Sequence, residues 1–445
     1  MDLRLQTGYK QILGMAMPIS LAILVPQINF FTNNIFLGGL GEQSLASAGI
    51  TGVYYLIFAV VGNGLNNGLQ TLIARKAGEN DLKAIGHLFF HGVWLSLAIS
   101  FVGIFITYTV APVLLRATIH DSKIYEQVIG FTYIRIWGLP LLYLYVMRNA
   151  LLVGTNQTRL LIWGTLAETG VNIFFDYALI YGHFGFAQIG FNGAAYASII
   201  AEAAGLLVIF VVIHFKGINK TFSLFENWKI DVGTLRHIFY KSLPLILQYA
   251  ISIITWEYFY ILIEHHGERA LAISNSMRNI LGVFGIFSWS FAATANTMVS
   301  NVIGQQKEEE VIPLINRIAV LSLACSAILT VMLNIDPRTF LMFYRQDDQF
   351  IAEAIPVIRV ISLALVMMSF SSVWLNSVTG TGNTVVNLII ESITLTVYCI
   401  YVYLVLETWN MSITWGWGSE MVYWVGMFSM SFGYMKSGRW KKKKR

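Results

Sequence analysis

The chain has 445 residues, of which 56% are hydrophobic and only 12% carry a charge. Soluble globular chains carry about twice that charged fraction, so the composition excludes an ordinary water-soluble domain. The formal net charge is +5. Its placement along the chain, described below, accounts for it without a nucleic-acid partner.

Apolar segments follow one another along the whole sequence, with short polar connections between them. A helix needs roughly 20 mostly apolar residues to cross the hydrocarbon core of a bilayer. This pattern leaves no room for a separate soluble domain and predicts an all-α integral membrane protein. We predict about twelve transmembrane helices, at residues 11–38, 47–75, 85–111, 125–151, 158–182, 191–215, 237–263, 270–303, 312–334, 350–378, 384–406 and 412–434.

Lys and Arg residues are distributed unevenly between the two ends of these spans. If both termini face the cytoplasm, 20 of the 29 fall on the cytoplasmic side, including the basic tail 436–445. Five fall outside: Arg116, Lys123, Arg269, Arg338 and Arg345. Four lie within spans or at their ends: Arg135, Arg148, Arg278 and Arg359. Because cytoplasmic loops are enriched in Lys and Arg, we predict a multi-pass protein with both termini in the cytoplasm.

The two halves of the sequence are related by one constant shift along the chain. Six predicted spans lie within that shift, and an even number gives both halves the same orientation in the membrane. We therefore predict two parallel six-helix repeats, residues 1–215 and 237–435, with a cytoplasmic linker at 216–236 and the basic cytoplasmic tail at 436–445. The shift superimposes four pairs: Pro18 on Pro244, Gly41 on Gly267, Gly78 on Gly304, and Gly154 on Gly380.

Polar residues inside spans are costly and usually face the protein interior. Carboxylates and amide oxygens suit Na⁺, and a buried carboxylate suits H⁺, so the pattern indicates a cation site. The alternative is that these groups only form hydrogen bonds between helices. Three spans of the first half carry polar residues four positions apart, on one helical face: Glu168, Asn172 and Asp176 in the fifth, Ser198 and Glu202 in the sixth, and Asn29 and Asn33 in the first.

The second half carries fewer polar residues within its spans. Glu257 lies in the middle of the seventh span, and Glu391 follows Asn387 by four positions near the start of the eleventh. Arg278 is available to pair with a carboxylate. We treat Glu257, Glu391 and Arg278, together with Glu202 of the first half, as candidates for a substrate cleft or a second-lobe site.

Signals for catalysis are weak. His87 and His91 lie four apart, but no further ligand follows at a metal-like spacing, so a hydrogen-bonded pair is the better interpretation. The sequence contains no nucleophile motif and no P-loop, which excludes ATP-driven transport by this chain alone. We expect no enzyme activity, no cofactor and no structural metal.

Several motifs together resemble the multidrug and toxic compound extrusion (MATE) family of secondary transporters. In the first half they are NNIFLGGLGEQSLASAG, GLQTLIARKAGEND, ALLVGTNQTRLLIWGTLAETGVNIFFDYALIYG and GFNGAAYAS. In the second half they are HHGERALAISNSMRNI, ANTMVSNVIGQQ and VTGTGNT. The resemblance covers about residues 10 to 435. It implies two six-helix lobes around a V-shaped cleft and export of organic cations against an inward flux of Na⁺ or H⁺.

The resemblance also implies a cation site in the N-terminal lobe, at Asp176, Asn172 and Ser198. The family pattern usually has an Asp in the first span, where this chain has Asn33. The site then keeps one carboxylate, and either Asp176 carries the coupling, with Glu168 as an accessory group, or coupling has moved to the other lobe. Other branches of the family use a Glu of the seventh span, for which Glu257 is the candidate.

Three classes of function follow. The leading hypothesis is a cation-coupled antiporter for amphipathic, often cationic, small molecules (xenobiotic or multidrug efflux), working as a monomer in a bacterial inner (plasma) membrane. Its partners are the small-molecule substrates, the lipid bilayer and a transported Na⁺ or H⁺. The second is a flippase for a lipid-linked or lipid-like substrate, which needs several basic residues in its cleft. The third, a membrane-bound enzyme or assembly factor, needs a nucleophile, metal cluster or large loop, and none is visible.

Overall fold

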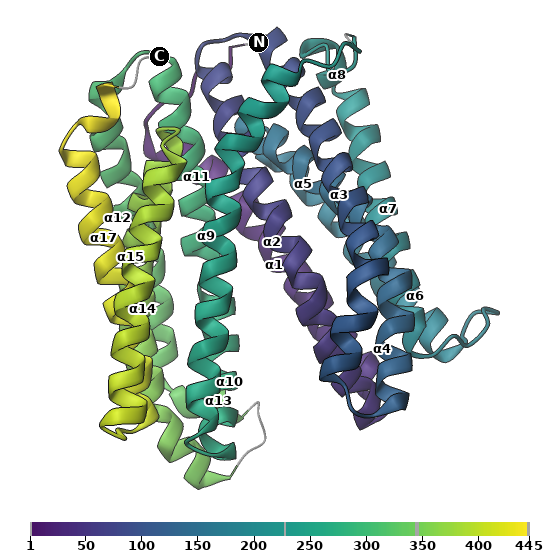
Figure 1. Ribbon diagram of the computed structural model, residues 1–445. Helices are drawn as coiled ribbons and strands as arrows, with labels where there is room; N and C mark the ends of the chain where they lie inside the picture. Colours follow the sequence, from purple (N-terminus) through teal and green to yellow (C-terminus); the bar gives the residue numbers. More distant parts are fainter. Residues whose placement is uncertain (1, 227, 343–346, 443–445) are drawn as a thin grey trace. The chain divides into compact units, whose positions relative to one another are not determined.

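The computed structural model describes residues 2–226, 228–342 and 347–442, and within these ranges all regular structure is helical (Figure 1). The first half contains α1 (Tyr9–Gly38), α2 (Glu42–Gly78), α3 (Leu82–Thr118), α4 (Ser122–Arg135), α5 (Leu139–Gly154), α6 (Leu161–Tyr181), α7 (Phe191–Phe215) and the short α8 (Ile218–Thr221). The second half contains α9 (Val232–Glu264), α10 (Glu268–Phe284), α11 (Ile286–Gly304), α12 (Val311–Ile335), α13 (Pro337–Met342), α14 (Asp348–Gly380), α15 (Thr384–Tyr403), α16 (Ile413–Trp417) and α17 (Ser419–Lys436). Arg345 and residues 443–445, which entered the charge count, lie outside the described residues.

Most of these helices are built to span a membrane. In the described ranges nine helical segments are long and apolar enough to cross a membrane, and one of them, Ser122–Gly154, comprises α4 and α5. The pair α10 and α11, bent by 47° at its break, makes a tenth. Helices α6 and α17 occupy the positions of the two remaining predicted spans. The protein is therefore an all-α integral membrane protein, as predicted. The sequence did not predict the interruptions at residues 136–138, 285 and 418, which divide spans into two helices.

Polar caps define several helix ends. The Asp81 carboxylate accepts a hydrogen bond from the Ala84 N–H (3.1 Å) at the start of α3. Asp121 accepts from the Lys123 N–H (2.7 Å) at the start of α4. The first-turn N–H groups of a helix have no partner within the helix, so such caps stabilise the short turns between spans.

Backbone conformations in the turns repeat at the shift that carries Pro18 onto Pro244 in the sequence. A left-handed or positive φ is uncommon outside glycine, so its recurrence at fixed spacing is a specific signal. It shows that equivalent turns of the two halves have equivalent geometry. Three pairs at this spacing have positive φ: Gly41 and Gly267 (104° and 97°), Asn80 and Gln306 (57° and 61°), and Asn156 and Gly382 (61° and 84°).

A close helix–helix contact repeats at the same shift. A Cβ added to Gly154 of α5 would lie 2.7 Å from Ile73 Cγ2 and 3.3 Å from the Gln70 carbonyl oxygen of α2. A Cβ added to Gly380 of α14 would lie 2.6 Å from the Asn296 carbonyl oxygen of α11. Since the shift that pairs the two glycines also pairs Gln70 with Asn296, each half uses one glycine to let two helices pack closely.

We expect Gly154→Ala and Gly380→Ala each to lower the free energy of unfolding by about 1–3 kcal/mol, because the added methyl forces tightly packed helices apart. Equilibrium unfolding of the purified chain in mixed detergent micelles measures this loss. Gly433→Ala in α17 is the matched control, since nothing lies within 4 Å of its Cβ position. Equal stability of all three variants would show that the repeated contact is not tight.

The chain forms two compact units, Leu21–Ile246 and Met1–Ser20 with Leu247–Arg445. The first residues pack within the second of these units, where the Leu5 N–H donates to Asn301 Oδ1 (3.0 Å). Arg317 Nη1 also donates to the Thr7 carbonyl oxygen (2.9 Å). The lobe boundaries at 215 and 237 follow the order of the spans along the chain and stay a prediction.

The linker 216–236 docks on α3. Phe222 is fully buried, and a Cβ on Gly86 would collide with its carbonyl oxygen. The Asp231 N–H donates to His91 Nε2 (2.8 Å). The Thr234 hydroxyl donates to the exposed Asp231 carboxylate (2.5 Å) and lowers the pKa of that group below its usual value. The polar connection is thus held by specific contacts at both of its ends.

Candidate functional site

Polar residues of α1, α6 and α7 meet around the Asn172 side chain in the Leu21–Ile246 unit. Asn172 and Asp176 lie one turn apart on α6 and are 1% and 0% exposed. The neighbouring groups fix the Asn172 amide so that Nδ2 donates to Asp176 Oδ2 (3.1 Å) and Asn33 Oδ1 (3.2 Å). Its oxygen accepts from the Ser198 backbone N–H (3.3 Å), and Asn29 lies within hydrogen-bond distance. The structure therefore brings together four of the five residues predicted for the cation site, with Asn29 of the first-span polar pair beside them.

The Asp176 carboxylate has no positive partner. No ion pair reaches it within residues 2–226, 228–342 and 347–442. Its Oδ1 is buried without a hydrogen-bond partner. A buried, unpaired carboxylate surrounded by amides is an acceptor for a proton or a hard cation such as Na⁺. Ser198 contributes its backbone N–H, which orients Asn172.

Glu168 belongs to a different polar group. It shares a helical face with Asp176, but eight residues separate the two, which is about 12 Å along a helix axis. The charges that act on Glu168 are Glu202, Arg148 and Arg135, and its Oε2 has no hydrogen-bond partner. The periodicity of α6 predicted the shared face correctly, but a shared face does not bring residues two turns apart into contact.

Glu202 is neutralised by a partner that the sequence did not reveal. Arg135, at the end of α4, donates to both of its oxygens, at 2.5 and 3.1 Å. Both side chains are largely buried, and the guanidinium carbon lies 4.0 Å from the centroid of the Tyr55 ring. A carboxylate in a bidentate pair is not free to bind a cationic substrate, so this arrangement argues against a place for Glu202 in a substrate cleft.

In the second unit, Glu391 of α15 is 1% exposed and hydrogen-bonded by neutral groups. Ser252 Oγ and Tyr423 Oη donate to Oε1 at 2.7 and 2.6 Å, and Gln248 Nε2 donates to Oε2 at 3.2 Å. Asn387 in turn donates to Gln248 Oε1 (2.5 Å). The pair Asn387 and Glu391, noted in the sequence, thus forms one network with α9 and α17.

A second buried carboxylate, Glu420, was missed by the sequence analysis. It is 3% exposed, and Trp424 Nε1 donates to it at 3.1 Å. It lines a cavity of about 160 Å³, half of whose lining residues are aromatic and which also reaches Ser252. The signal in the sequence was an acidic residue within a Trp- and Tyr-rich span, at 415–424.

The remaining candidates of the second half are on the surface of their unit. Glu257 is exposed, and within the described ranges no ion pair or hydrogen bond holds its carboxylate. Arg278 is also exposed, with its guanidinium 5.1 Å from the centroid of the Tyr260 ring. The structure does not bring either residue to Glu391.

The histidine pair is a hydrogen-bonded pair, as interpreted from the sequence. His91 Nδ1 lies 2.7 Å from the His87 carbonyl oxygen, and its Nε2 accepts from the linker, so both ring nitrogens are used. In the part of the chain that the structure describes, no three His, Cys, Asp or Glu side chains are grouped to hold a metal ion.

The profile of the MatE family matches residues 18–178 and again residues 244–404, which is more than two thirds of the chain. The chain belongs to the MatE family. The two matched segments start and end at positions related by the same shift that pairs Pro18 with Pro244, so the match confirms that the protein is a tandem repeat of one MatE unit. It also confirms the resemblance found in the sequence motifs.

Curated relatives of this MatE protein carry the name "Probable multidrug resistance protein NorM". The relative from Thermotoga maritima is 23% identical over 458 residues, covering 98% of this chain and 93% of its own length. The relative from Synechocystis sp. is 27% identical over 228 residues. This chain spans about half the length of the Synechocystis relative (48%) and of the one from Halalkalibacterium halodurans (51%).

Solved structures show the same MatE fold at low identity. An outward-facing multidrug resistance MATE family transporter of the MOP superfamily aligns with a TM-score of 0.91 at 18% identity, over 99% of this chain and 98% of that one. A MOP superfamily transporter from Pyrococcus furiosus aligns with a TM-score of 0.90, also at 18% identity, with the same coverage. These likenesses establish the fold of the whole chain.

Proposed function

We propose that this MatE protein is a secondary active antiporter that exports amphipathic, often cationic, small molecules in exchange for Na⁺ or H⁺, by alternating access. The observation that carries the proposal is the buried Asp176 carboxylate, which has amide neighbours and no ion-pair partner among the described residues. A buried charge of this kind is costly unless a cation binds to it. The relatives' name, multidrug resistance protein, supports the class of substrate.

Asp176 and the amides of Asn29 and Asn33 form the proposed cation site. Carboxylate and amide oxygens are the hard ligands that Na⁺ prefers, and the free Asp176 Oδ1 is equally able to take a proton. Asn172 positions Asp176, because its own oxygen is held by the Ser198 N–H. Asp176 lies five residues before the end of α6, about 7.5 Å inside the helix at 1.5 Å per residue.

A flippase for a lipid-like substrate is not favoured. Such a protein needs several free basic residues in its cleft, and the ion pair with Glu202 removes Arg135 from the few candidates. The relatives are named for multidrug resistance. We place the protein in a bacterial inner membrane with both termini in the cytoplasm, on the basis of the Lys and Arg bias.

Reconstitution of the full chain into liposomes tests the proposal. We expect an imposed Na⁺ gradient or an imposed pH gradient to drive movement of ethidium several-fold faster than in protein-free liposomes. The two gradients are imposed separately, so the result also names the coupling ion. Dye movement that neither gradient accelerates would contradict antiport, and scrambling of a fluorescent lipid in the same liposomes would favour the flippase.

A further inference from the structure

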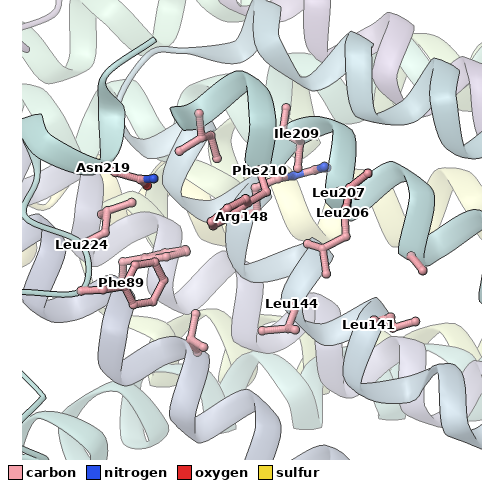
Figure 2. Close-up of a pocket in the computed structure, with 14 residues that line it drawn as sticks. Phe89, Leu141, Leu144, Arg148, Leu206, Leu207, Ile209, Phe210, Asn219 and Leu224 are labelled. Atoms are coloured by element: carbon pink, nitrogen blue, oxygen red, sulfur yellow. The ribbon is translucent and has the colours of Figure 1, made fainter. Parts of the chain in front are cut away.

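An apolar groove lies on the Leu21–Ile246 unit, between α3, α5, α7 and the linker. Its volume is about 400 Å³, within the range of small-molecule sites. Figure 2 shows Phe89 of α3, Leu141 and Leu144 of α5, and Leu206 and Phe210 of α7 around it. Almost all the other lining residues are apolar as well, so the groove suits a hydrocarbon chain.

The one charged residue in this groove is Arg148 of α5 (Figure 2). It is 2% exposed, and among the described residues its Nε and Nη1 have no hydrogen-bond partner. Its Nη2 donates to Asn149 Oδ1 (2.6 Å), and the guanidinium lies 3.7 Å from the centroid of the Tyr145 ring. Leaving N–H donors of a buried Arg without an acceptor costs free energy, and an oxygen of a phosphate or carboxylate group can accept from them.

Tyr145 contacts Arg148 and the charge of Glu168 acts on it, but neither group lies at ion-pair distance from the guanidinium among the described residues. Within the described ranges no carboxylate forms an ion pair with Arg148. The Arg148 side chain packs against Gly164 of α6, and Glu168, one turn further along α6, does not reach it. Arg135 differs, because Glu202 pairs with its guanidinium, whereas no carboxylate of the described residues forms such a pair with Arg148.

We propose that the groove binds an anionic phospholipid, with the phosphate on Arg148 and an acyl chain along the apolar walls. Charge complementarity selects this occupant: the exposed Lys216 and Lys220 flank Asn219 at the edge of the groove. The cytoplasmic leaflet, which these residues face in the topology predicted from charge, is the anionic one. An amphipathic cation would be repelled by Arg148, and a small soluble anion would leave the apolar walls unfilled.

The lipid site is separate from the proposed cation site, and its test needs no transport. The purified full chain is delipidated in detergent and titrated with phosphatidylglycerol or phosphatidylcholine of identical acyl chains, and bound lipid is counted by native mass spectrometry. We expect wild type to prefer phosphatidylglycerol by about tenfold or more, as expected from charge-assisted hydrogen bonds. Arg148→Gln should remove this preference, and Arg148→Lys should keep most of it.

Two variants of α7 separate the groove from the charge. Ala203→Trp fills the groove without changing Arg148 and should weaken binding of phosphatidylglycerol by about tenfold. Val211→Trp places the same side chain at an exposed position of α7 outside the groove and should bind like wild type. This pair keeps the test valid if Arg148→Gln fails to fold.

Three results would overturn the proposal. The first is a wild-type protein that shows no preference for phosphatidylglycerol. The second is an Arg148→Gln variant that folds and retains the preference for phosphatidylglycerol. The third is equal binding of phosphatidylglycerol by the Ala203→Trp and Val211→Trp variants. Displacement of phosphatidylglycerol by inorganic phosphate alone would also overturn it, because the site would then bind a soluble anion. Gradient-driven transport is measured independently, so its failure leaves this result unaffected.

Discussion

Asp176→Asn is expected to reduce gradient-driven export by about tenfold or more, towards the passive leak of the liposomes. The substitution preserves the shape of the side chain and allows the hydrogen bond with Asn172 to form. It removes the only charge of the cation site. A hydrogen bond or contact to a charged group contributes about 1.5–3 kcal/mol, which corresponds to roughly tenfold or more in affinity for the coupling ion. Ethidium movement under the gradient that drives the wild-type protein measures the loss.

Three further variants show whether the effect is specific to this site. Asn33→Asp places a second carboxylate beside Asn172 and should maintain or strengthen coupling. Glu168→Gln should have a milder effect than Asp176→Asn, because Glu168 lies in the group of Arg135, Arg148 and Glu202. Glu257→Gln is the control in the second half of the chain. If Asp176→Asn transports at the wild-type rate while Glu257→Gln is inactive, the cation site belongs to the second half.

The second large effect concerns the pair Arg135 and Glu202. Arg135→Gln is expected to lower the free energy of unfolding by about 3–5 kcal/mol, because it leaves a buried carboxylate without its partner. The side chains in this pair are only 13% and 7% exposed, so solvent does little to compensate for the loss. Equilibrium unfolding in mixed detergent micelles is the measurement.

Two comparisons test whether burial of the ion pair is the cause of the large loss of stability. The double variant Arg135→Met with Glu202→Leu removes both charges and should recover most of the lost stability. Arg338→Gln breaks the ion pair with Asp348, whose side chains are 54% and 88% exposed, and should cost less than about 1 kcal/mol. A cost below that level for Arg135→Gln as well would show that Glu202 finds another partner.

The class of protein, the spans and the repeat followed from the sequence because each depends on local or periodic properties. Hydrophobic length decides which segments span a bilayer, and the constant shift that pairs Gly41 with Gly267 is visible without any coordinates. Asn172 and Asp176 are four residues apart, which predicted that they share one face of α6, and the structure has them there. The interruption at Gly285 between α10 and α11 was not predicted, since the apolar pattern continues through it.

Only the tertiary structure decided which polar groups meet. Periodicity assigns a residue to a face of its own helix, but not to a neighbour on another helix or to a depth along the axis. For this reason Glu168 was grouped with Asp176, and the separation of 67 residues between Arg135 and Glu202 concealed their ion pair. The same reason applies to Arg148. Its unused donors depend on how α3, α5 and α7 pack around it, which the sequence does not show.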